Sequence, residues 1–300
     1  MFLQTRKLYF MKNRNFILIL AALSIPFLIP YCRIMKDILP YALSIMLFFN
    51  FINLEPGIIK FRKEYFYYPA FALLIFCPFA LLLSSLCGIE NCTGIILLAA
   101  APAAVSSPVM ADFIGADKNL SVMLAVISNL LAPLIFSAAA FLYLPEKIDF
   151  SFADAAAKSA SVIFIPLAAA LLFRAFKSGR IPSKISGLSG TVLFPVIIFA
   201  AVMSSKNSIL EADKTDLIFP AIAAFILCGI SFSTGFFASK NKATAKSLSL
   251  LFGHKNTALS AYVALASAPP ETVTPILFYI IFHHIANSIL SLIFGKSTAK

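Results

Sequence analysis

The chain has 300 residues, of which 60% are hydrophobic and only 12% are charged. Soluble domains carry about 25% charged residues, so this composition excludes an ordinary soluble globular protein. The formal net charge of +11 would suggest nucleic-acid binding in a soluble protein, but the placement of the charges described below accounts for it without a nucleic-acid partner.

Apolar runs close to 20 residues recur along the whole sequence, which is the length that a helix needs to cross a bilayer. They predict an all-α polytopic membrane protein in which residues 1–300 form a single membrane domain. The first run follows several basic residues, as a signal peptide does, but no small-x-small cleavage pattern follows it, so we keep it as a membrane helix. We expect about ten transmembrane helices, called spans one to ten here: 16–34, 37–54, 66–87, 92–116, 119–143, 153–176, 183–205, 216–238, 243–267 and 273–294.

The lysines and arginines fall mostly on one side of the membrane when the loops are assigned alternately to the two sides. One side collects 17 of the 24, the other collects six, and the remaining one, Lys255, lies within a span. By the positive-inside rule, both termini are expected in the cytoplasm, with the protein in the cell's inner membrane. This asymmetry explains the basic charge and favours an even number of spans.

Ten spans divide into two sets of five, and an odd number of helices per set turns the second set upside down. We therefore expect inverted repeats over 16–143 and 153–294, an arrangement typical of secondary transporters. Weak internal similarity supports this division, because Ser128-Asn129 in span five resembles Asn287-Ser288 in span ten.

Span four contains two prolines, Pro102 and Pro108, with Val105, Ser106 and Ser107 between them. Proline removes a backbone donor and clashes with the preceding helical turn, so the span is expected to break. The amides at the start of the second half would then attract an anion. The alternative is a kinked helix whose serines bond back to their own carbonyls.

Span nine is interrupted at the matching fourth position of its repeat by Gly253, His254, Lys255 and Asn256. A lysine at the bilayer centre costs roughly 2.5–3.5 kcal/mol on insertion scales, and such residues usually face a cavity or a partner. Glycine weakens the helix and asparagine suits a new N-cap. We expect a discontinuous helix that lines a watered cavity.

Lys255 is read either as the fixed positive charge of an anion site or as a group that exchanges a proton. The alternative is a side chain that reaches water through the break and has no role in transport. His254 is the weaker candidate of the two. Because His283 and His284 are adjacent and point to different faces, neither is a convincing metal ligand, and we expect no metal and no cofactor. Further cavity candidates lie on spans five and ten: Ser121, Asn129, His283 and Asn287.

Two pairs of residues near the ends of spans carry smaller expectations. Asp112 and Asp117 are expected at the cytoplasmic surface, exposed to solvent. Cys87 and Cys92 flank a short loop, and a disulfide between them would require that loop to be external.

This pattern resembles the bile acid:sodium symporter family over nearly the full chain at the level of spans. The resemblance is clearest over Pro102–Pro133 and Gly253–Leu259, where the family carries Ser-Asn on span four and Glu-x-Gly-x-Gln-Asn on span nine. It implies a core of spans three to five and eight to ten, in which discontinuous spans four and nine cross. Spans one, two, six and seven would form a panel, and substrate would bind between the two domains as they rock. The shared motifs are Gly115-Ala116-Asp117, Leu120-Ser121 and Leu131-Ala132-Pro133.

The departures from the family pattern concern its two sodium sites. The resemblance aligns family ligands with Ser107 and Ser121, which are retained here, whereas the shared glutamate aligns with Leu251 and a glutamine aligns with Lys255. A further family glutamine has no equivalent, because Gln4 is the only glutamine in the chain. We therefore predict that the sodium sites are lost, and that the Lys255 ammonium stands where a sodium ion would. The positions at which ligands are lost are Pro108, Ala125, Leu251 and Lys255.

The sequence thus predicts a secondary active transporter of a small organic anion, embedded in the lipid bilayer and working by alternating access. Asn256 would hydrogen-bond the substrate, and protons or exchange would drive transport. Three alternatives remain: a carrier of the same fold with an arsenite-type or auxin-type cargo, a membrane sensor that does not transport, and a membrane-embedded enzyme. The enzyme is disfavoured because no acid–base or metal residues converge at one depth.

Overall fold

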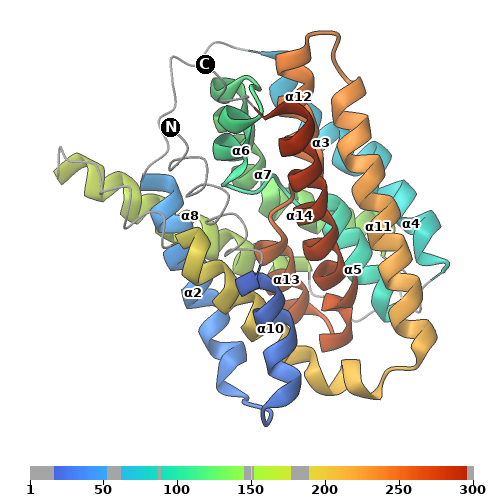
Figure 1. Ribbon diagram of the computed structural model, residues 1–300. Helices are drawn as coiled ribbons and strands as arrows, with labels where there is room; N and C mark the ends of the chain where they lie inside the picture. The colour runs from blue at the N-terminus through green and yellow to red at the C-terminus, as the bar shows by residue number, and fades with distance from the viewer. Residues whose placement is uncertain are drawn as a thin grey trace.

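The computed structural model of the protein describes residues 17–52, 62–86, 89–144, 150, 152–176 and 189–295 (Figure 1). Within these residues the regular secondary structure is helical, apart from one isolated antiparallel β-bridge between Ala103 and Lys255. Seven helices of this part are long and apolar enough to cross a membrane. The predicted all-α, polytopic architecture is therefore confirmed at this level.

Four of the predicted spans are continuous helices in the structure. Their boundaries lie within a few residues of the sequence prediction because charged or polar residues end each apolar run. They are α2 (Ile34–Ile52), α7 (Lys118–Tyr143), α8 (Phe152–Phe176) and α11 (Lys214–Phe237).

The first predicted span, 16–34, is shorter in the structure than expected. A short apolar helix covers Ile17–Leu28 and ends in the 3₁₀ turn η1 (Ile25–Leu28). Ile29 then adopts an extended conformation, because the residue before a proline, here Pro30, is pushed out of the helical region.

Three spans combine different helical geometries. Span three runs through η2 (Lys63–Phe66), α3 (Tyr67–Phe71), the π-helical turn η3 (Ala72–Phe76) and α4 (Cys77–Ser84). Span seven begins, in its described part, with the π-helical turn η4 (Ser189–Leu193) and continues as α10 (Phe194–Glu211). Span ten consists of η5 (Pro270–Val273) and α14 (Thr274–Phe294).

The fourth and ninth predicted spans each contain two helices separated by a short non-helical segment. Helices α5 (Ile89–Ala100) and α6 (Ser107–Phe113) cover the fourth, and α12 (Lys242–Gly253) and α13 (Thr257–Ser267) cover the ninth. In Figure 1, α6 and α12 lie in the upper half of the molecule, whereas α5 and α13 lie in the lower half. The two non-helical segments, 101–106 and 254–256, meet between them.

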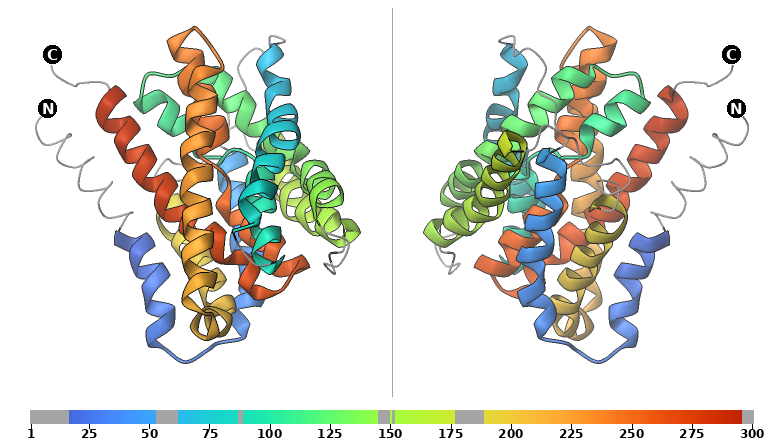
Figure 2. Two further views of the ribbon diagram at one scale, coloured as in Figure 1. Left: turned by 90° about the vertical axis from the view of Figure 1, so that its right-hand side faces the viewer. Right: turned by 90° about the vertical axis from the view of Figure 1, so that its left-hand side faces the viewer.

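The helices form two groups by their contacts, and these groups also meet extensively. In one, α2 contacts α8, α10 and η4, and α10 also contacts η1. In the other, α11 packs against α12 and α14, while α5 packs against α4 and α7. Figure 1 shows α2 beside α10 and away from α11 and α12 at the opposite side of the view, whereas the end of α10 runs on into α11, as Figure 2 also shows. The groups meet where α8 contacts α7 and α13 and where α10 contacts α13.

Candidate functional site at the paired helix breaks

The two non-helical segments bond to each other through their backbones. The amide of Ala104 donates to the carbonyl of His254 at 2.7 Å, and the amide of Asn256 donates to the carbonyl of Pro102 at 2.7 Å. Backbone groups in the membrane interior must find partners inside the protein. Each break therefore satisfies groups freed by the other, and the two segments are held together.

Lys255 is almost completely buried at this junction, with 2% of its surface exposed. Its Nζ donates to the carbonyl of Ala99 at 2.9 Å and to that of Ala101 at 3.5 Å, and lies 5.2 Å from the centre of the Phe76 ring. The intervening carbonyl of Ala100 accepts a hydrogen bond from the Tyr68 hydroxyl at 2.7 Å. Lys255 and Tyr68 thus cap the C-terminal carbonyls of α5.

This capping matches the electrostatics of a helix end. The last carbonyls of a helix lack amide partners, and together they carry about half a negative charge. A cation at that position is favoured, which offsets part of the cost of burying the Lys255 ammonium. The side chain therefore joins span nine to the end of α5.

Helix α7 is hydrogen-bonded to the paired breaks through two polar side chains. The side-chain amide of Asn129 donates to the carbonyl of Ala103 at 2.8 Å, and the amide of Ala103 donates to the Ser128 hydroxyl at 3.2 Å. Asn256 donates through its side chain to Asn129 at 2.9 Å and accepts from the amide of Leu259 at 3.2 Å. The predicted N-cap role of Asn256 is confirmed, and the same side chain connects both breaks to α7.

A group of aromatic and imidazole side chains lies at the other side of the span-nine break. The Tyr279 hydroxyl donates to the carbonyl of Gly253 at 2.8 Å, and the His254 ring lies 5.3 Å from that of His283. His254 Nδ1 and the Ser107 hydroxyl oxygen are 3.5 Å apart. The structure thus brings together His254, Ser107 and His283, which the sequence analysis had nominated separately.

Helix α14 carries polar atoms that have no hydrogen-bond partner among the described residues. They are Nδ1 of His283, Nε2 of His284 and Oδ1 of Asn287, all shielded from solvent. The His284 ring lies 5.8 Å from that of Phe194 on α10, which belongs to the other helix group. These atoms have hydrogen-bonding capacity that the described residues do not use.

Other nominated residues are less closely involved in the junction. Val105 and Ser121 are buried, and the Ser121 hydroxyl has no partner among the described residues, whereas Ser106 is exposed. Pro108 lies in the first turn of α6, where proline is tolerated because its missing amide would be unpaired anyway. It begins a helix rather than interrupting one.

Several positions that align with family sodium ligands are apolar or cationic here, although Ser107 and Ser121 are retained. Ala125 and Leu251 are buried, and neither side chain offers an oxygen. Lys255 places an ammonium where the resemblance puts a glutamine. Gly253 ends α12 with its Cα against the Phe232 ring, and a Cβ there would overlap that ring.

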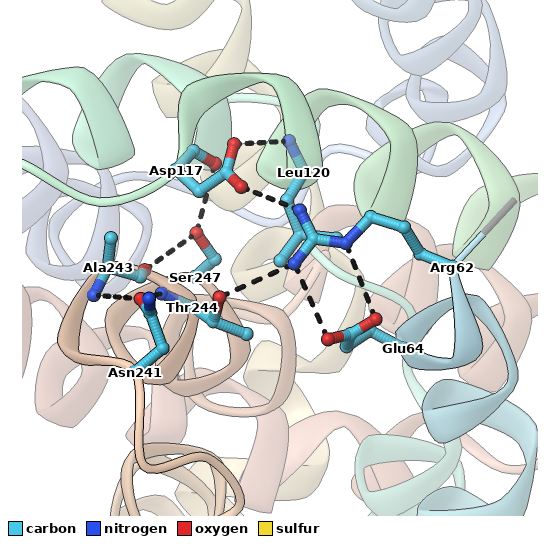
Figure 3. A network of polar contacts seen from close by, with 8 residues as sticks. All are labelled: Arg62, Glu64, Asp117, Leu120, Asn241, Ala243, Thr244 and Ser247. Atoms are coloured by element: carbon cyan, nitrogen blue, oxygen red, sulfur yellow. Dashed lines mark hydrogen bonds and ion pairs between the residues drawn. The ribbon is translucent and has the colours of Figure 1, made fainter. Parts of the chain in front are cut away.

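A polar network at the end of the molecule where α12 begins was missed at the sequence level (Figure 3). Arg62 donates to Asp117 at 2.7 Å and to Thr244 and Glu64 at 3.4 Å, while Asp117 also accepts from the amide of Leu120 at 3.0 Å. Asp117 is therefore paired and caps α7, which corrects the expectation that it is simply solvated. The sequence signal for this capping role was the predicted helix start just after Asp117, since aspartate is a preferred N-cap residue.

Cys87 lies outside the described residues, so its pairing with Cys92 stays a prediction.

Comparison with known proteins agrees with the resemblance. The family model described as the sodium bile acid symporter family matches residues 64–212. A protein of Bacillus subtilis (strain 168), described as the uncharacterized sodium-dependent transporter YocS, is 22% identical over 219 residues. That alignment covers 70% of this chain and 66% of the relative, just under two thirds of its length. The chain thus has a multi-pass helical architecture and is similar, over just under half of its length, to the sodium bile acid symporter family.

Proposed function

We propose that the protein is a secondary active transporter of a small organic anion, that it works by alternating access, and that it does so without sodium at the family positions. The observation that carries this proposal is the buried Lys255 ammonium, bonded to the carbonyls of Ala99 and Ala101 where the two breaks pair. The match to the family model supports transport. The residues at the junction support an anionic substrate and transport without sodium.

The loss of sodium binding is argued from ligands and charge. Sodium needs several oxygen ligands, and a carboxylate helps it to bind. The resemblance places that carboxylate at Leu251, which is a buried apolar side chain here. A sodium ion about 4 Å from the Lys255 ammonium would be repelled by about 4 kcal/mol at an effective dielectric constant of 20. The lysine therefore replaces the ion rather than joining it.

The same charge favours an anionic substrate. Nζ of Lys255 donates to two carbonyls and the side chain is almost completely buried, so we assign its contribution to an anion to the electric field at the junction rather than to direct contact. Direct contacts to the anion are assigned to the exposed Ser106 hydroxyl and to Nδ1 of His283 in the tautomer that donates there, whereas the unpartnered Oδ1 of Asn287 accepts and is assigned to a donor group of the substrate. We also include His254, Ser107 and Asn256 in the site, because they lie at the paired breaks.

The two helix groups support the rocking mechanism. We assign α2, α8 and α10 to the panel, and the helices around the breaks to the core, with α5–α6 and α12–α13 as discontinuous spans four and nine that cross within two inverted repeats. Lys158 on α8 donates to the carbonyl of Ala266 near the end of α13 at 2.5 Å. This bond joins panel and core in the present conformation and would break when they separate. We place both termini in the cytoplasm and the protein in the inner membrane, following the basic loops.

The relative's description gives sodium dependence for that protein. In this chain, sodium ligands are missing at positions that align with the family's sodium sites. We therefore propose another driving force, a proton gradient or an exchanged anion. An uptake assay separates these possibilities from sodium coupling.

The experiment is uptake of a panel of radiolabelled small carboxylates into proteoliposomes that contain the full chain. Sodium and pH gradients are imposed separately at equal ionic strength. We expect uptake of at least one carboxylate at the same rate when potassium replaces sodium. Lys255→Gln should reduce that uptake at least tenfold, whereas Lys36→Gln, a change at an exposed lysine, should leave it unchanged.

Two results would contradict the proposal. Strong stimulation of wild-type uptake by sodium would refute the loss of the family sodium sites. Unchanged uptake by the Lys255→Gln protein would remove this lysine from the mechanism.

A further inference from the structure

A recess with a volume of about 330 Å³ lies apart from the paired breaks, where the start of span three meets the turn between α11 and α12. Two segments that are distant in the sequence, 63–67 and 238–248, form the recess. Most of the residues that line it are polar. The residues that line it are Lys63, Glu64, Tyr67, Ala238, Ser239, Lys240, Asn241 and Leu248.

The polar side chains of the recess have spare donors rather than spare acceptors. Ser239 Oγ accepts from the amide of Asn241 at 3.2 Å, and Asn241 Oδ1 accepts from the amides of Ala243 and Thr244 at 3.0 and 3.1 Å. What remains is the Ser239 hydroxyl hydrogen and the side-chain NH₂ of Asn241. Figure 3 shows the oxygen of Asn241 turned toward the start of α12.

The charge of the recess is positive. Lys63 and Lys240 are exposed and make no ion pair or hydrogen bond within the part of the chain that the structure describes. The single lining carboxylate, Glu64, lies 3.4 Å from Arg62 through each of its oxygens, so its charge is compensated from outside the recess. Glu64 also interacts electrostatically with Lys63, and because Arg62 already pairs with that carboxylate, the recess keeps a net positive charge.

The walls of the recess are held in place by the network behind them. Arg62 bonds to Asp117 at 2.7 Å and to Thr244 at 3.4 Å, which ties the start of span three to α7 and α12 (Figure 3). Partial burial works against the charged guanidinium, but the hydrogen bonds to Glu64 and Asp117 outweigh it and raise the pKa of Arg62 above its ordinary value. The Arg62 guanidinium thus stays charged across the ordinary pH range.

The recess also lies at the start of an apolar span, where lipid headgroups are expected. Lys63 is the first residue of the apolar span Lys63–Ser84, and Lys240 precedes α12 by two residues. Basic side chains at the cytoplasmic ends of membrane helices attract anionic headgroups, at about 1 kcal/mol for each lysine or arginine near the surface. Lysine is also a frequent phosphate ligand as a point charge.

We propose that this recess binds a phosphate group through Lys63, Lys240, Ser239 and Asn241. The group is either the phosphodiester of an anionic phospholipid headgroup or a soluble phosphate. Bound there, it links the start of span three to the start of α12 and stabilises this corner of the molecule. The proposal is independent of the transported substrate.

The test compares thermal unfolding midpoints of the full-length protein in detergent. The additions are phosphatidylglycerol, phosphatidylcholine with the same acyl chains, and inorganic phosphate against chloride at equal ionic strength. We expect phosphatidylglycerol or inorganic phosphate to raise the wild-type midpoint by several degrees relative to its control. The double variant Lys63→Gln/Lys240→Gln should lose that shift. Lys242→Gln, a change at an exposed lysine outside the recess, should keep it.

The two arms identify the source of the phosphate. A shift with phosphatidylglycerol alone assigns a lipid headgroup, and a shift with inorganic phosphate assigns a soluble ligand. No shift in either arm overturns the proposal, and so does an equal shift in the double variant and in Lys242→Gln. If the double variant does not fold, Lys240→Glu alone should abolish the shift, and a retained shift in that variant would count against the proposal.

Discussion

Lys255 brings a full positive charge to the centre of a buried junction and meets carbonyl oxygens there. An isolated ammonium in an apolar medium is very unfavourable, but hydrogen bonds to a charged group contribute about 1.5–3 kcal/mol each. The carbonyls of Ala99 and Ala101 are also at the negative end of α5. The lysine is therefore tolerated because a helix end was left unpaired by the break in span four.

The bond between Asn129 and Asn256 is expected to couple α7 to span nine energetically. Asn129→Ala or Asn256→Ala leaves buried polar groups without partners, which costs about 1–3 kcal/mol in each case. A double-mutant cycle on the free energy of unfolding should give a coupling of about 0.6–1.7 kcal/mol, as for polar pairs in other membrane proteins. A coupling energy of zero would show that the 2.9 Å contact adds nothing.

The candidate site was predictable from sequence where a residue type conflicts with its surroundings. A lysine and a histidine inside an apolar run identified Lys255 and His254 without any structure. The partners were not predictable, because Asn129 and Asn256 are 127 residues apart and the Tyr68 hydroxyl could have bonded to any nearby carbonyl. Ser106 was nominated with its neighbours but is exposed, since periodicity does not apply inside a break.

At the scale of elements, close helix packing depends on glycine at one position of α11. A Cβ at Gly235 would overlap the carbonyl oxygen of Leu248 on α12, whereas a Cβ at Gly229 on the same helix would meet nothing within 4 Å. Small residues at helix interfaces let membrane helices approach closely. Gly235 therefore sets the distance between α11 and α12.

This contrast gives a prediction with an internal control. Gly235→Ala should lower the free energy of unfolding by about 1–3 kcal/mol, because the overlap forces the two helices apart. Gly229→Ala should be neutral or stabilising by up to about 1 kcal/mol, because alanine is the better helix former. Thermal or denaturant unfolding in detergent measures both, and equal effects would mean that Gly235 is not an interface residue.

Helix boundaries were predictable where charges end an apolar run and unpredictable where backbone chemistry decides. Span five was expected at 119–143 and α7 covers Lys118–Tyr143. Span one ended early at Ile29, before Pro30. Span seven was expected to end at 205, but α10 continues to Glu211, since Lys206 and Asn207 can extend a helix beyond its apolar part.

At the scale of the whole molecule, the two helix groups are joined in the described part of the chain by the hydrogen bond from Lys158 to the carbonyl of Ala266. Lys158 also lies 3.9 Å from Asp154, one turn away on α8. A transporter that rocks must break such contacts in each cycle. The panel and core assignment can therefore be tested at this position.

Crosslinking across the two groups should stop transport reversibly. We expect a short thiol-reactive crosslinker to join Lys158→Cys to Ala266→Cys, in a chain whose five native cysteines are replaced by alanine. Uptake should fall at least tenfold and recover when a cleavable crosslinker is reduced. Crosslinking within α8, between Asp154→Cys and Lys158→Cys, is the matched control and should leave uptake unchanged. Full activity of the crosslinked Lys158–Ala266 protein would refute relative motion of these helices.

The most direct test of the central claim is sodium binding by the protein itself. Thermal unfolding midpoints are compared in sodium and potassium chloride at equal ionic strength, for the wild type, for Leu251→Glu/Lys255→Gln, and for Leu251→Gln/Lys255→Gln as the uncharged control. A ligand at 100 times its dissociation constant stabilises by about 2.7 kcal/mol. We predict no sodium-specific shift for the wild type or the control, and a saturable sodium-specific rise for the variant that carries glutamate. A saturable rise in the wild type would show that Lys255 does not stand in place of sodium.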